Sequence, residues 1–217
     1  VLVALVVYNI RPVAGTWQQL TDKGAWEVLR APLKGAWFQT LTHIAVTTLW
    51  ILPVIRSSAG VRVAYMIFSA VLQVVVSYWF YFDWVQHGAI DGGPLGFLSW
   101  SVPTLVGTLA CDAVATHDGR PRLASMILWS VILMGTGYLL SCPTTLYNVT
   151  EAEAESVRGQ RFPADPVLPT RERLSTHTLE LVEPPFVPPP GTNERQENYW
   201  MMSQRAGTLS GYSPSVM

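Results

Sequence analysis

The stretch VAYMIFSAVLQVVVSYWFYF, residues 63–82, is the clearest indication of the fold of this chain. It contains no formally charged residue, and a helix of roughly 20 apolar residues is long enough to cross the hydrocarbon core of a bilayer. Lipid offers the backbone no hydrogen bonds, so a stretch of this kind is stable there as a helix, whose N–H and C=O groups pair internally. The stretch therefore predicts a transmembrane helix.

Three further stretches share this apolar character. They cover about 36–55, 95–115 and 123–142, and charge enters them only at Asp112. Residues 1–10 are also apolar but too few to cross a bilayer, and they fit the end of a truncated span. We therefore predict an all-α, polytopic transmembrane helix bundle with four full spans and a partial first span.

Charge and proline divide the chain after Cys142. Residues 1–142 hold 14 charged residues (8 Lys+Arg and 6 Asp+Glu), whereas residues 143–217 hold 15 (6 and 9) together with ten of the 16 prolines. Prolines favour extended or polyproline backbone. We predict a Pro-rich extramembrane tail over 143–217, which is either a disordered linker or a segment docked on another surface. Segments 11–35 and 198–210 are expected to lie in the membrane interface.

Composition excludes two classes of protein. A net charge of −1 argues against a basic nucleic-acid-binding protein. Two cysteines, Cys111 and Cys142, are too few for a disulfide scaffold, and the predicted topology places them near opposite membrane faces. The sequence contains no phosphate-binding loop, dinucleotide fingerprint, nucleophile elbow or zinc-binding pair.

The short loops differ in their predominant charge on the two sides of the membrane. On one side, called side B, loops 56–62 and 117–122 carry four arginines. On the other, side A, loop 83–94 carries two aspartates and the tail opens with three glutamates. The positive-inside rule makes side B cytoplasmic, although the basic segment 11–35 on side A opposes it. We expect a bacterial inner-membrane protein with residues 143–217 in the periplasm.

His43 is the candidate site residue. It lies about two turns into a predicted span, with Gln39 and Thr47 one turn away on the same face. An intramembrane histidine can bind a haem or chlorophyll or transfer a proton, and it can equally be a neutral residue hydrogen-bonded between helices. Cofactor binding is therefore assigned to His43, with the cofactor unknown. Asp112 is expected to meet water or Arg120.

Several segments resemble one family. They are PFVPPP at 185–190, NYWMMSQRAGTLS at 198–210, the span region 123–147 and, more loosely, FQTLTHIA at 38–45. Together they resemble bacterial membrane proteins of the heparan-alpha-glucosaminide N-acetyltransferase-like family. That resemblance implies a protein of about ten helices in which a histidine of an early external region relays acetyl from acetyl-coenzyme A. That early region has no counterpart here, so no catalytic residue is carried over.

Three functions follow in order of preference. The first is a non-catalytic integral membrane subunit, whose partners are the bilayer and other membrane subunits of a larger complex, for example an energy-transducing photosynthetic or respiratory assembly. The second is a fragment of a membrane acyltransferase. The third is cofactor binding through His43. Nucleic acid is not expected as a partner.

Overall fold

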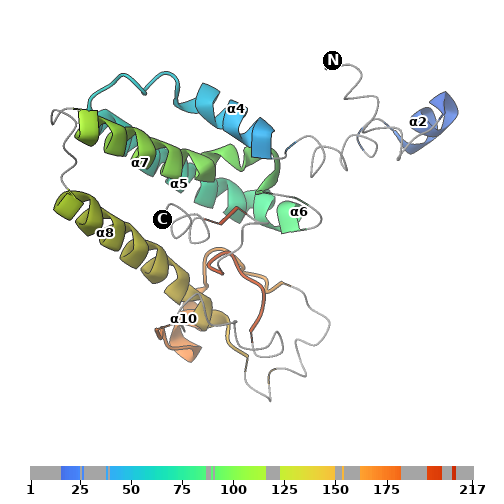
Figure 1. Ribbon diagram of the computed structural model, residues 1–217. Coiled ribbons are helices and arrows are strands. Elements are labelled where there is room, and N and C mark those ends of the chain that lie inside the picture. The colour runs from blue at the N-terminus through green and yellow to red at the C-terminus, as the bar shows by residue number, and fades with distance from the viewer. Residues whose placement is uncertain are drawn as a thin grey trace.

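The computed structural model describes residues 16–24, 26, 38, 40–86, 89, 91–115, 123–149, 153, 162–181, 195–201 and 207–208, and the statements below concern these residues. Their regular structure is helical, and one isolated bridge joins Asn148 to Arg195. In chain order the elements are α2 (Trp17–Lys23), α4 (Thr40–Ile51), α5 (Ala59–Val76), η1 (Ser77–Tyr81), α6 (Phe82–Gln86), η2 (Gly93–Leu95), α7 (Phe97–Ala115), α8 (Leu123–Ser141), η3 (Cys142–Tyr147) and α10 (Arg171–Thr176) (Figure 1).

Three continuous helices in the described part of the chain are long and apolar enough to cross a membrane. They run over Ala59–Val85, Gly93–Val114 and Ala124–Tyr147, with 27, 22 and 24 residues. They coincide with three of the stretches picked out by composition, so the mostly helical character of the described residues is confirmed, and three helices are candidate membrane spans. The last helix continues to Tyr147, five residues beyond its predicted end at 142.

The fourth predicted span, 36–55, contains a shorter helix. α4 has 12 residues and ends at Ile51, which corresponds to about 18 Å at 1.5 Å per residue. Pro53 explains the end of the helix, because it lacks a backbone N–H and disfavours helical backbone at the preceding residue. Turns follow up to Arg56. Pro103, in contrast, lies inside α7.

The helices α4, α5 and α7 form a bundle whose interior is polar. α7 packs against both α4 and α5. The buried residues of α4 are His43, Thr47 and Ile51, and those of α5 are Arg62, Ser69 and Gln73. Large apolar side chains such as Leu41, Ile67 and Val71 are instead exposed. This arrangement is the reverse of a water-soluble protein and suits a bundle surrounded by lipid.

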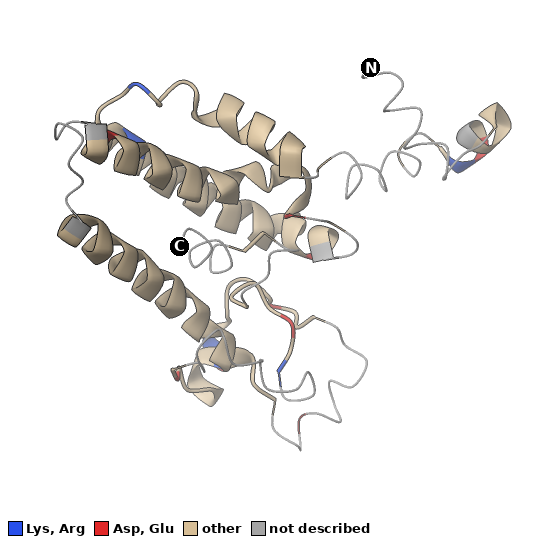
Figure 2. Cartoon of the chain, viewed as in Figure 1, with Lys and Arg blue, Asp and Glu red and all other residues tan. Residues whose placement is uncertain are grey.

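The helix α8 lies apart from this bundle in Figure 1, and its main contacts with other elements are with η3, which continues it. Four consecutive residues near its start, Met126 to Trp129, are exposed. Successive helical residues are about 100° apart, so four of them cover every side of the helix. Figure 2 shows the helices almost free of charge, with charged residues at helix ends and in connecting segments.

The described part of the tail docks on η1 and α6, which continue α5. At η1 the helix widens into a π-turn, and Tyr81, Phe82 and Val85 form a buried cluster with Val167 and Tyr199 of the tail. The hydroxyl of Tyr81 also donates to the carbonyl of Gly92 (2.6 Å) and accepts from the N–H of Leu95 (2.6 Å). The tail was expected to be either a disordered linker or a docked segment, and its residues Val167 and Tyr199 are docked.

Several predicted segments lie outside the described residues. They include the partial span 1–10, most of the interfacial segment 11–35 and the proline run 185–190. Within 11–35, Thr16 caps α2 by accepting from the N–H of Gln19 (3.3 Å). Within 198–210, the described residues Asn198–Met201 form a turn in which Asn198 and Tyr199 are buried.

Candidate functional site

A line of buried polar side chains runs through the α4–α5–α7 bundle and is the candidate site. We call it the polar seam and define it as His43, Thr47, Ser69, Gln73 and Ser77, all buried. His43, Ser69 and Gln73 are fully excluded from solvent, at 0% exposed. The spacing explains the line, because residues three or four positions apart share one face of a helix.

Hydrogen bonds between α4 and α5 fix which residues lie at the same height. The indole Nε1 of Trp50 donates to Ser69 Oγ (2.9 Å), and the hydroxyl of Tyr65 donates to the carbonyl of Trp50 (2.9 Å). Because the two helices are antiparallel neighbours joined by a short connection, one turn toward side A from this bond reaches Thr47 on α4 and Gln73 on α5. These two side chains therefore lie at one level of the bundle.

His43 lies one turn further toward side A, against α7. Its ring stacks on Trp100, with ring centroids 5.6 Å apart and an angle of 5° between the planes. A Cβ placed on Gly96 would come within 2.8 Å of His43 Cε1, so glycine is the residue that lets the imidazole sit against this backbone. Nearby, Thr40 donates to the buried carboxylate of Asp91 (3.0 Å).

This packing sets a condition on cofactor binding at His43. The ring is fully buried, and Trp100 covers one face of it. A haem or chlorophyll needs open volume beside a ring nitrogen, so it could be bound here only if Trp100 or a neighbouring segment moved. The arrangement fits a core histidine that joins α4 to α7, and cofactor binding at His43 stays a prediction.

An apolar layer closes the seam toward side B. Ile51, Val54 and Leu105 form a buried cluster with Trp50, Tyr65 and Met66 packed around it. Leu105 is 0% exposed. We call Ile51, Val54 and Leu105 the apolar plug. It separates the seam from the charged residues at the side-B end of the bundle.

Beyond the plug, an ion pair joins α5 to α7. Arg62 is buried at 5% exposed, and its guanidinium pairs with Asp112 and donates to Thr108 Oγ1 (3.2 Å). Asp112 was expected to meet water or Arg120: its side chain is 58% exposed and so does meet water, it also pairs with Arg62, and Arg120 lies outside the described residues. Arg62, which was predicted to lie in the loop 56–62, is instead part of α5, and its charge is paired with that of Asp112. The pair fixes the height of α5 relative to α7.

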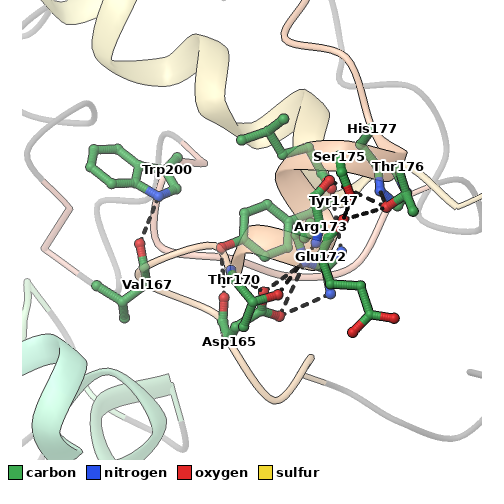
Figure 3. A network of polar contacts seen from close by, with 11 residues as sticks. Tyr147, Asp165, Val167, Thr170, Glu172, Arg173, Ser175, Thr176, His177 and Trp200 are labelled. Carbon is green, nitrogen blue, oxygen red and sulfur yellow. Dashed lines mark hydrogen bonds and ion pairs between the residues drawn. The ribbon is translucent and has the colours of Figure 1, made fainter.

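A second polar network lies in the tail (Figure 3). Arg173 donates from Nε (2.9 Å) and Nη2 (2.9 Å) to the carboxylate of Asp165, and its guanidinium lies 4.6 Å from the ring centre of Tyr147. The Tyr147 hydroxyl donates to the carbonyl of Asp165 (2.6 Å). The network ties the tail to the end of the α8–η3 helix.

Burial and hydrogen bonds act in opposite directions on Asp165. Burial raises the pKa of its carboxyl, whereas hydrogen bonds from Arg173 and from the N–H of Thr170 and the charge of Arg173 lower it, and the net pKa lies below the ordinary value. The carboxylate is therefore charged at neutral pH and holds Arg173 in place.

The remaining candidate residues are not brought together. Cys111 is exposed and Cys142 is buried, both as free thiols. His177 lies at the end of α10, and His87 and His117 fall outside the described residues. Among the described side chains, no group of three His, Cys, Asp or Glu residues is placed to hold a metal ion.

Comparisons with known proteins add no relative. No family model matches the chain, and searches among curated proteins and among solved structures return no match.

Sequence reasoning did not single out Gln73, Arg62 or Arg173. Gln73 is the one amide within the apolar stretch 63–82, which was a usable signal. Arg62 was assigned to a loop because it stands one residue before that stretch. Arg173 had no local signal, since its partner Asp165 lies eight residues away in a proline-rich segment.

Proposed function

We propose that this chain is a non-catalytic integral membrane subunit that packs against other membrane subunits of a larger complex. The single observation that carries the proposal is α8, a helix long enough to cross a bilayer whose large apolar side chains are mostly exposed. The α4–α5–α7 bundle supplies its own helix contacts. Among the described residues, α8 makes no helix-to-helix contacts of comparable extent. Helices in a membrane associate through close packing, so α8 is the helix with room for a partner.

The surface of α8 suits a partner helix. Ile127, Trp129 and Leu139 are 61%, 60% and 63% exposed. Gly135 faces open space, with nothing within 4 Å of a Cβ placed on it. A glycine of this kind lets a second backbone approach closely, and large apolar residues around it supply contact area.

The finer topology is part of the proposal. α4 serves as a fourth span together with the three longer helices, supported by its packing along α7 and by the apolar residues on its outer face. The arginines of the side-B loops support a cytoplasmic side B, with the Pro-rich tail in the periplasm of a bacterial inner membrane. An energy-transducing assembly, photosynthetic or respiratory, is one class of complex that holds small subunits of this kind.

Native gel electrophoresis with in-gel absorbance tests this function. The tagged chain is extracted from its source membrane in a mild detergent, and the band is analysed by mass spectrometry. Migration within a large complex at fixed stoichiometry supports the subunit function and identifies the partners. Migration as a small colourless particle overturns it.

A membrane acyltransferase is the second function we propose, supported by the resemblance of residues 185–190 and 198–210 to the heparan-alpha-glucosaminide N-acetyltransferase-like family. The test is acetyl transfer from radiolabelled acetyl-coenzyme A to an amino sugar by the full-length gene product. Transfer supports this function, and a rate equal to that of empty membranes rejects it. Cofactor binding at His43 has a separate test, because His43→Leu would remove an absorption band from the purified chain.

A further inference from the structure

Two side chains of the polar seam have buried polar atoms with no protein hydrogen-bond partner. They are Gln73, through both Oε1 and Nε2, and Thr47, through Oγ1, and no described residue of the chain satisfies them. Gln73 is 0% exposed and Thr47 is 2% exposed. Neither lipid nor a partner subunit reaches atoms buried to this degree.

The two side chains belong to the same level of the bundle. The Trp50–Ser69 hydrogen bond of 2.9 Å ties α4 to α5, and Thr47 and Gln73 each follow one turn later toward side A. Both are on the buried faces of their helices. The interior at this level therefore offers one amide oxygen, one amide N–H₂ group and one hydroxyl.

Leaving such groups unpaired is unfavourable, at roughly 1–3 kcal/mol for each buried donor or acceptor. A buried water makes about three hydrogen bonds to groups of this kind, and two to four polar partners are what it needs. The amide and the hydroxyl together meet that number. We propose that Gln73 and Thr47 form a binding site for internal water within the α4–α5–α7 bundle.

The apolar plug lies between the site and side B. Ile51 lies one turn from Thr47 toward side B, and Leu105 closes the same layer from α7. A dry layer at this position keeps the water apart from the Arg62–Asp112 pair. The plug therefore closes the site toward side B, and the polar seam ends blind there.

Water-edited solid-state NMR on the labelled chain in lipid bilayers tests the site directly. The Gln73 side-chain amide signal is assigned by its loss in Gln73→Met, and its magnetisation is followed after selective excitation of water. Rapid build-up, close to that of the exposed Gln19 side chain, is expected. Build-up as slow as that of the Leu105 backbone amide in the plug overturns the proposal.

A double-mutant cycle gives a second, independent readout. Gln73→Met and Thr47→Val nearly preserve volume and remove only polar atoms. If the two residues share water, each single substitution leaves the other group poorly satisfied and lowers the thermal midpoint by about 2–4 °C, whereas the double variant regains most of that loss. Thr48→Val, on the exposed side of α4, is the matched control. Additive effects, or single variants more stable than the parent, contradict a shared water site.

Discussion

The α4–α5–α7 bundle and α8 are both apolar helical structures, yet they are held in place in different ways. In the bundle, polar side chains turn inward and hydrogen bonds such as Trp50–Ser69 and Arg62–Thr108 join the helices. α8 has apolar side chains on every side, and its described anchor is the network that follows it at Tyr147. The difference indicates that hydrophobicity places helices in the membrane, while buried polar groups decide which helices stay together.

The largest effect is expected from removing the anion of the bundle's ion pair. Asp112→Leu leaves the buried guanidinium of Arg62 with Thr108 and no counter-charge, and we expect a loss of about 3 kcal/mol in unfolding free energy. Unfolding in mixed micelles, followed by tryptophan fluorescence, measures it. The double variant Arg62→Met/Asp112→Leu removes the stranded charge and should recover most of the loss. If the double variant is no more stable than Asp112→Leu, the pair does not hold α5 to α7.

The next effect concerns the anchor of α8. Arg173→Met removes the charged hydrogen bonds to Asp165. A hydrogen bond to a charged group contributes about 1.5–3 kcal/mol to stability. A loss of about 2 kcal/mol in docking would raise the rate of tail cleavage by a protease about 30-fold. Arg171→Met, on the exposed start of α10, is the matched control. Unchanged cleavage of Arg173→Met would show that the tail is held elsewhere.

Acid should loosen the same anchor without a substitution. The pKa of Asp165 is lower in the folded chain than in the unfolded one, so its contribution is complete above the unfolded value of about 3.9 and is lost as pH falls through the folded pKa. Cleavage of the tail by pepsin should therefore increase below about pH 4. The effect is smaller than that of Arg173→Met, because a protonated carboxyl still accepts a hydrogen bond. Arg173→Met should show a weaker pH dependence, and an equal dependence in both proteins would assign the acid effect to another group.

The bundle was largely predictable from composition, and the anchor was not. Three of the long helices follow directly from their apolar stretches, because lipid imposes a simple length and charge rule. α4 departed from that rule at Pro53, where a local backbone effect competes with hydrophobicity.

The aromatic run 78–82 shows why local pattern was insufficient for the anchor. Aromatic residues near the end of a span commonly form a belt at the membrane interface, and Tyr78, Trp79 and Phe80 are exposed as a belt requires. The π-turn, however, directs Tyr81 and Phe82 beneath the tail. Their partners, Val167 and Tyr199, are more than 80 residues away in sequence, and no periodicity in a single sequence encodes such a contact.

The smallest effect on the isolated chain, and the sharpest test of the comparison, is expected on α8. Leu139 is 63% exposed, so Leu139→Ala should change the stability of the purified chain by less than about 0.5 kcal/mol. In the source membrane the outcome should differ, because a partner helix packed on this surface would lose contact area with the side chain. We therefore expect the fraction of Leu139→Ala that comigrates with the large complex on a native gel to fall while its stability in detergent is unchanged. Leu41→Ala, equally apolar and exposed on α4, controls for lipid contact alone, and an equal fall for both variants would mean that α8 is no more an interface than the outside of the bundle.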